Sequence, residues 1–164
     1  MKATSAKGTP AAFFDVDGTL GSTNVVQAYA DLRIRGLSLL RRWAWLTVFL
    51  PKLPYYGILD TMSRNRFSEV FYRNYAKFDQ SDLDLWAADA VERYWAPRLF
   101  PEALEQLRDH RAQGHRVILV SGGIEPMLRP LAAMLETDAL IATRPEMEGT
   151  RLTGRLVDGP MGEE

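Results

Sequence analysis

A pair of aspartates stands directly after a short apolar run near the start of this 164-residue chain. The run Ala11–Val16 is typical of a buried strand in a parallel sheet, and Gly18 then permits a tight turn. Side chains two positions apart on a strand point the same way, so Asp15 and Asp17 are expected to lie side by side. Burying two carboxylates together is costly unless a cation or a reaction compensates. A plain Asp-Gly turn is the alternative, but the strand context favours a functional site.

The order of the predicted elements indicates an α/β fold. Strands are predicted at residues 11–16, 116–120 and 138–142, helices at 101–113 and before Leu135, and a hairpin at 147–157. This order is typical of a doubly wound, Rossmann-like parallel sheet. Between the first two strands, helices are predicted at residues 23–35, 37–50 and 58–78, with a fourth opened by a capping box of Ser81 and Asp84 and closed by Pro97. We interpret this stretch as a helical cap inserted over the C-terminal edge of the sheet, where such folds hold ligands.

The predicted division is a disordered leader at residues 1–10, a core at 11–22 and 98–164, and a cap insertion at 23–97. The leader lacks the apolar region of a secretion signal. The chain has no cysteine, which excludes disulfides and cysteine-ligated metal sites. From these observations we expect a cytoplasmic protein.

Charge is distributed unevenly along the chain, although the net charge is only −1. Residues 31–66 carry a net charge of +5, and residues 37–50 combine Arg41 and Arg42 with Trp43, Trp45 and Phe49. A basic, aromatic helix can lie in a membrane interface, and this segment predicts peripheral membrane contact and a lipid-like phosphate as substrate. The alternative is that the aromatic side chains form the internal core of the cap.

A second candidate site follows the predicted strand at residues 116–120, where Ser121-Gly122-Gly123 turns the chain. A hydroxyl group and backbone amides at the N-terminus of a helix suit a phosphoryl group. A plain turn with a helix cap is the alternative. The position of this turn, one helix downstream of the inserted cap, favours phosphate binding at Ser121 and Gly122.

These two motifs resemble those of the haloacid dehalogenase superfamily, whose first motif, Asp-x-Asp-x-Thr after a hydrophobic strand, is matched by Asp15, Asp17 and Thr19. The resemblance implies a phosphate-monoester hydrolase in which Asp15 is the nucleophile and forms an aspartyl phosphate. It implies that Asp17 is the general acid and base, that Gly18 and Thr19 help bind phosphate, and that Mg²⁺ is held by Asp15 and Asp17. The inserted helices are most similar to those of the phosphoserine-phosphatase-like branch.

The sequence also departs from that branch. A hairpin containing Leu152-Thr153-Gly154-Arg155 and the segment Gly159–Glu164 resemble the approach to the third motif, but the Lys of that motif and the acidic fourth motif are absent. We therefore expect the natural chain to continue beyond Glu164, and the 164-residue form to hold metal poorly and to turn over slowly or not at all. Asn24 occupies the place of an acidic residue that binds the amino group of phosphoserine, which argues against phosphoserine as the substrate.

Two other functions are compatible with the same residues. One is a non-catalytic or regulatory domain that binds phosphorylated ligands. The other is a phosphotransferase module linked to lipid metabolism, which would pass the phosphoryl group to an acceptor other than water. The expected ligand in every case is a phosphorylated small molecule or lipid-like phosphate. The carboxylate pair and the lack of a basic motif argue against nucleic acid, and the oligomeric state is not predicted.

Overall fold

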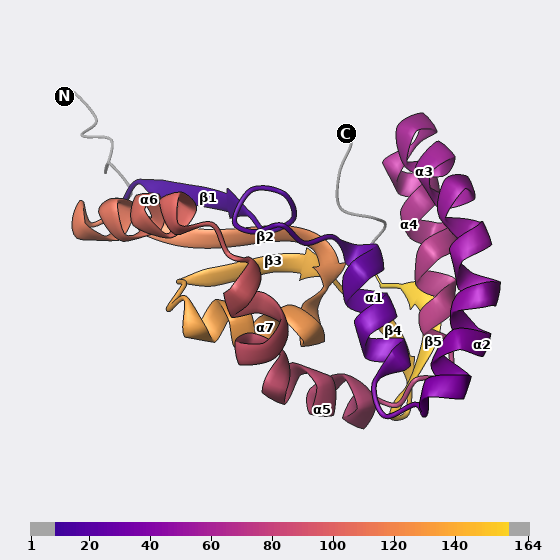
Figure 1. The fold of residues 1–164 in the computed structure, drawn as a ribbon. Helices are drawn as coiled ribbons and strands as arrows, with labels where there is room; N and C mark the ends of the chain where they lie inside the picture. The colour runs from indigo at the N-terminus through magenta and orange to yellow at the C-terminus, as the bar shows by residue number, and fades with distance from the viewer. Residues whose placement is uncertain (1–8, 158–164) are drawn as a thin grey trace.

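The computed structural model describes residues 9–157, so the predicted leader lies almost wholly outside the described residues, as does Gly159–Glu164. Its central sheet has three parallel strands in the order β1-β2-β3, which is the predicted α/β class. The strands are β1 (Ala11–Asp15), β2 (Arg116–Ile124) and β3 (Ala139–Thr143). Helix α6 (Pro101–Ala112) precedes β2, and α7 (Glu125–Met134) connects β2 to β3 (Figure 1).

Strand β2 is longer than predicted. The sequence places its end at Val120, whereas the strand continues through Ser121 to Ile124 with an irregular register against β3. Helix α7 consequently begins at Glu125, and Ser121 does not lie at a helix N-terminus. The two glycines after Ser121 prompted the prediction of a turn, but they adopt extended backbone here, which glycine also permits.

Helices fill the stretch between β1 and α6, as predicted, but their boundaries differ. The elements are α1 (Val25–Ile34), α2 (Leu39–Phe49), η1 (Leu50–Lys52), α3 (Leu53–Met62), α4 (Arg64–Tyr72), η2 (Arg73–Tyr75), α5 (Gln80–Ala90), η3 (Val91–Trp95) and η4 (Ala96–Arg98). Helices α1 to α4 stand at the end of the sheet toward which its strands point (Figure 1). Helix α5 packs against α7. The division into core and cap stays a prediction.

Three details of this helical stretch correct the sequence-based expectation. The helix predicted over 58–78 is broken at Ser63, whose extended backbone and side-chain oxygen cap the start of α4. The capping box of α5 is formed by Asp79 and Asp82 and not by Ser81 and Asp84. The helix predicted over 37–50 ends at Phe49, but helical structure resumes well before residue 58, because Pro51 and Pro54 lie in the first turns of η1 and α3, where a missing N–H is harmless.

The segment that leaves the sheet after β1 pairs with the segment that leads back toward it before α6. The segments 20–22 and 98–100 run antiparallel: the Ser22 N–H donates to the Arg98 carbonyl at 2.9 Å, and the Phe100 N–H donates to the Leu20 carbonyl at 2.8 Å. A Cβ added at Gly21 would lie 2.7 Å from the Arg98 carbonyl oxygen, so the pairing requires glycine there. This contact fixes the helices relative to the end of β1.

Aromatic side chains form the core of the helical stretch. Tyr29 of α1 lies in ring contact with Phe49, Phe71 and Tyr75, and Tyr56 contacts Phe71 edge-on at 5.4 Å. Of residues 37–50, Phe49 joins this core whereas Trp43 is 61% exposed, and membrane contact stays a prediction. None of the helices in residues 9–157 combines the length and apolar character that crossing a bilayer requires.

The predicted hairpin at 147–157 is present as β4 (Pro145–Glu148) and β5 (Arg151–Leu156). Gly149 has a positive φ of 62° in its turn. The hairpin packs against the helices and not against the central sheet, because the Lys77 N–H donates to the Leu152 carbonyl at 2.9 Å, and the Leu152 N–H donates to the Phe78 carbonyl at 2.9 Å.

Candidate active site

The first predicted motif forms a compact loop at the carboxyl end of β1. The Leu20 N–H donates to the Asp15 carbonyl at 3.1 Å, and the Gly21 N–H donates to the Val16 carbonyl at 3.2 Å. Gly18 has a φ of +80°, a backbone conformation that glycine adopts without strain. The loop is short and internally hydrogen-bonded, so the positions of both carboxylates follow from the backbone of β1.

Asp15 lies at the exposed edge of this loop, and its carboxylate accepts a hydrogen bond from the Thr19 hydroxyl at 3.3 Å. Thr19 and Gly18 are exposed on the same loop. The first motif therefore presents an accessible carboxylate, a hydroxyl group and a flexible turn to one patch of surface. A nucleophile must reach its target from solvent, and the Asp15 carboxylate has that access.

Asp17 is set deeper and is held by two hydroxyl groups. The Thr23 hydroxyl donates to Asp17 Oδ1 at 3.0 Å, and the Ser121 hydroxyl donates to Asp17 Oδ2 at 3.3 Å. Burial raises the pKa of the Asp17 carboxyl, and the charge of Asp15 raises that pKa further, while the two hydrogen bonds oppose the rise. A carboxyl group in such a setting is suited to hold and release a proton.

The second predicted motif meets the first at this point. Ser121 is buried, and its hydroxyl oxygen also accepts the Gly123 N–H at 3.0 Å. Gly122 turns its carbonyl away from the aspartates: it accepts the Thr143 hydroxyl at 2.8 Å and the Tyr72 hydroxyl. Tyr72 thus ties α4 to the end of β2, and burial raises the pKa of Tyr72, so its hydroxyl remains a donor.

A cavity of about 440 Å³ opens beside Asp17, between the loop and helices α1, α3 and α4. Its lining includes Asn24 and adds two charged side chains that the motifs did not indicate, Asp60 and Arg64, together with Tyr56 and Phe67. Arg64 is close enough for its positive charge to lower the pKa of Asp17. In the sequence Arg64 was one of seven basic residues in a basic stretch, and no local pattern distinguished it from the others.

Asn24 has a structural task as well as a place in this cavity. Its side chain caps α1 by accepting the Gln27 N–H at 2.9 Å. The side chain is therefore engaged, and its position does not supply the acidic group that the phosphoserine-phosphatase-like pattern has there. The cavity offers Asp60 as a carboxylate on its opposite wall.

The carboxylates fit a hard divalent cation in chemistry but do not complete a site for one. Asp15 and Asp17 supply oxygen ligands of the type that Mg²⁺ prefers, and the accessible side of Asp15 leaves room for water or substrate oxygens. Within residues 9–157, no three acidic or histidine side chains gather into a metal-binding group. A cation here would depend on oxygen atoms of Asp15 and Asp17 and on further oxygen atoms, such as those of water or substrate.

Solved structures share this fold. A protein of unknown function from Bordetella pertussis Tohama I is 22% identical, with a TM-score of 0.72 over 93% of this chain and 68% of that chain. A phospho-aspartyl intermediate analogue of phosphoserine phosphatase is 17% identical, with a TM-score of 0.55 over 93% and 64%. Phosphoserine phosphatase from T. onnurineus is 20% identical, with a TM-score of 0.53 over 91% and 64%. The chain thus spans about two thirds of the length of these structures.

A comparison of sequences identifies the family to which the chain belongs. No curated protein matches the chain, but a family described as haloacid dehalogenase-like hydrolase matches residues 12–164. The matched range takes in Asp15, Asp17 and Ser121. On this match the chain belongs to the haloacid dehalogenase-like hydrolases.

Proposed function

We propose that the chain carries the nucleophile-bearing part of a Mg²⁺-dependent phosphate-monoester hydrolase. The observation that carries the proposal is the hydrogen bond from Ser121 to Asp17, which brings the ends of β1 and β2 together beside the accessible Asp15 carboxylate. The likeness to solved phosphoserine phosphatases, including an analogue of a phospho-aspartyl intermediate, supports the same chemistry.

In the proposed reaction a carboxylate oxygen of Asp15 attacks phosphorus, and the bond from phosphorus to the leaving oxygen breaks. Asp17 gives its proton to that leaving oxygen and then takes a proton from the water that attacks the aspartyl phosphate. The second step breaks the bond between phosphorus and the Asp15 oxygen, releasing phosphate and restoring the carboxylate. The Ser121 hydroxyl donates its single proton to Asp17, and it would donate to a phosphoryl oxygen by exchanging that hydrogen bond. Mg²⁺ would be held by the Asp15 carboxylate and the Asp17 carbonyl and would offset charge on the phosphoryl oxygens.

The proposal is tested with the native protein, purified from its natural source. The assay measures phosphate release from p-nitrophenyl phosphate. We expect release with Mg²⁺ and none after chelation by EDTA. Binding of phosphorylated ligands without release would favour the regulatory alternative. Transfer of the phosphoryl group to an added alcohol, in place of water, would favour the phosphotransferase alternative.

Arg64 is proposed to bind an anionic group of the substrate. We expect Arg64→Gln to raise KM about tenfold, because a charge-assisted hydrogen bond is lost, with a smaller change in kcat. Arg66→Gln is the matched control, since Arg66 lies on the same helix and does not line the cavity. Initial rates over a range of substrate concentrations measure both constants. Equal effects of the two substitutions would contradict the assignment.

We also propose that residues 37–50 contact an anionic membrane, which would place an amphiphilic phosphate within reach. The exposed apolar side chains that support this include Leu39 at 72%, Leu40 at 80% and Trp43 at 61% exposure, beside the exposed Arg41 and Arg42. An exposed apolar cluster beside basic side chains suits the boundary of an anionic bilayer.

Co-sedimentation with vesicles of phosphatidylcholine and phosphatidylglycerol tests this contact. We expect Arg41→Glu/Arg42→Glu to weaken binding by roughly tenfold or more, because each basic residue near such a surface contributes about 1 kcal/mol. Arg108→Glu/Arg116→Glu changes the charge equally on α6 and β2 and should bind as the unchanged protein does. Unaltered sedimentation of the Arg41/Arg42 variant would remove the proposal.

A further inference from the structure

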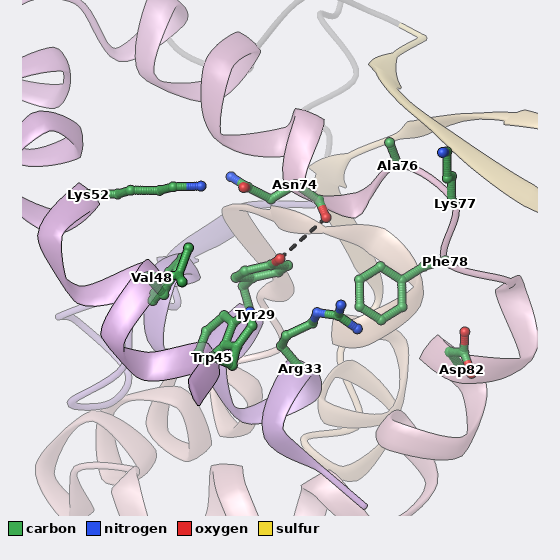
Figure 2. Close-up of a pocket in the computed structure, with 11 residues that line it drawn as sticks. Tyr29, Arg33, Trp45, Val48, Lys52, Asn74, Ala76, Lys77, Phe78 and Asp82 are labelled. Carbon is green, nitrogen blue, oxygen red and sulfur yellow. Dashed lines mark hydrogen bonds between the residues drawn. The ribbon is translucent and has the colours of Figure 1, made fainter. Parts of the chain in front are cut away.

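A second cavity of about 440 Å³ lies away from the aspartates, among α1, α2, η1 and the loop after η2 (Figure 2). Neither Asp15 nor Asp17 lines it. Tyr29 and Phe49 line this cavity, and Tyr56 lines the cavity beside Asp17, so the aromatic core separates the two spaces. A volume of this size is within the range that small-molecule ligands occupy.

Three cations from three separate segments line this cavity: Arg33 of α1, Lys52 of η1 and Lys77. None of them forms a salt bridge to an acidic side chain within residues 9–157, whereas Arg35 and Arg93 nearby are both paired with Asp89. All three side chains are exposed and solvated, and together they make the space between them favourable for an anion. The lining has one carboxylate, Asp82, which accepts the Asp79 N–H at 3.1 Å in the cap of α5.

Apart from the amide side chain of Asn74, the rest of the lining is apolar or aromatic. Tyr29 and Phe49 are buried, and Trp45 stacks on Phe49 with ring centroids 4.4 Å apart. Figure 2 shows the Arg33 guanidinium between Tyr29 and Phe78, and the Arg33 Cζ atom lies 5.5 Å from the centroid of the Phe78 ring. Lys52 reaches toward Asn74 from the other side (Figure 2). A ligand that fills the cavity would therefore need an anionic group and an apolar body.

Lys77 has a backbone conformation that bears on the choice of variant at this position. Its φ is +74°, a region that side-chain-bearing residues rarely adopt and that glycine would occupy more easily. Hydrogen bonds between 77–78 and Leu152 of β5 hold the conformation. A left-handed residue is common just after a helix end, and Lys77 follows Ala76, the C-cap of η2.

We propose that this cavity binds an amphiphilic phosphate, with its phosphate group at Arg33, Lys52 and Lys77 and its apolar part against Val48, Trp45 and Phe78. The phosphate could be that of a free small molecule or the headgroup of a lipid, since both present the same chemistry. This site is separate from the proposed catalytic aspartates and does not depend on their activity.

Isothermal titration with hexyl methyl phosphate tests the proposal. This probe is a soluble phosphodiester, which the proposed monoester hydrolysis does not consume. We expect Lys52→Gln/Lys77→Gly to weaken binding at least about tenfold. Glycine accepts the backbone of position 77, so the variant should keep its fold. Arg108→Gln, which removes a cation on α6, and Asp15→Asn should both bind as the unchanged protein does.

Vesicles of phosphatidylcholine with and without phosphatidic acid distinguish the two sources of the ligand. Weaker binding of the Lys52/Lys77 variant to the phosphatidic acid vesicles identifies a lipid headgroup, and an effect confined to the soluble probe identifies a free ligand. The proposal is overturned if the unchanged protein does not bind hexyl methyl phosphate, or if the Lys52/Lys77 variant binds it equally well. Loss of binding on Arg64→Gln alone would place the probe in the cavity beside Asp17 and would also overturn it.

Discussion

Replacing Asp15 with Asn is expected to lower kcat for phosphate release by at least about 10⁴-fold, because an amide oxygen cannot replace the attacking carboxylate. The fold should not suffer, since Asp15 is exposed and its side chain accepts one weak hydrogen bond, from Thr19. Initial rates of phosphate release measure the effect, and thermal unfolding followed by circular dichroism checks the fold.

Asp84→Asn is the matched control for this experiment. Asp84 is exposed on α5 and lines neither of the two large cavities, so the same chemical change there should leave kcat unaltered. If Asp15→Asn kept its rate within tenfold of the unchanged protein, Asp15 would not be the nucleophile. The assignment of the first motif would then have to be withdrawn.

Replacing Trp86 with Ala is expected to lower the free energy of unfolding by about 3–5 kcal/mol. Trp86 of α5 has no solvent exposure and packs against Tyr94 and Trp95. Its Nε1–H donates to Asp31 Oδ2 of α1 at 2.7 Å, so truncation leaves a void and removes one partner of that carboxylate. The guanidinium of Arg93 still holds Asp31 through two hydrogen bonds, which keeps the loss within the range for a core cavity.

Urea unfolding followed by circular dichroism measures this loss, with Trp43→Ala as the control. Trp43 is 61% exposed on α2, so its removal should change the free energy of unfolding by about 0.5 kcal/mol or less. Equal destabilisation by the two substitutions would show that α5 is not anchored through Trp86 as the structure describes.

The parts of the fold that sequence reasoning located are those whose signals are local. The apolar run before Asp15, the β-branched run after Arg116 and the turn at Gly149 each produce the predicted strand or hairpin. The parallel order of the sheet follows, because helices connect those strands. Mg²⁺, the aspartyl phosphate and the roles of the site residues remain proposals.

The errors arose where two local signals compete. The apolar face of residues 58–78 is continuous in the sequence, but Ser63 can cap a helix through its side chain, and it starts α4 there. Ser81 with Asp84 and Asp79 with Asp82 have the same spacing, and the structure uses the earlier pair. Pattern alone does not choose between two such caps, because the choice depends on where the preceding loop meets Arg151 of β5.

The cavities could not be predicted from any one segment. Arg64 reaches the Asp17 cavity because it is the first residue of α4, directly after the Ser63 cap, and Tyr72 at the other end of α4 reaches Gly122 of β2. The cavity lined by Arg33, Lys52 and Lys77 likewise brings together α1, η1 and the loop after η2, which are far apart in the sequence. Such groupings follow from packing between helices, and the 3.6-residue periodicity of a single helix carries no information about them.

Chemical trapping of the phosphorylated residue tests whether Asp15 is the nucleophile. The native protein, purified from its natural source, is mixed with acetyl phosphate and Mg²⁺. The reaction is quenched with borohydride, which reduces an aspartyl phosphate to homoserine. Peptide mass spectrometry then locates the reduced residue. We expect homoserine in place of Asp15. We expect no homoserine after EDTA treatment or in the Asp15→Asn variant. Homoserine at another aspartate, or none with Mg²⁺ present while phosphate is released, would contradict this assignment.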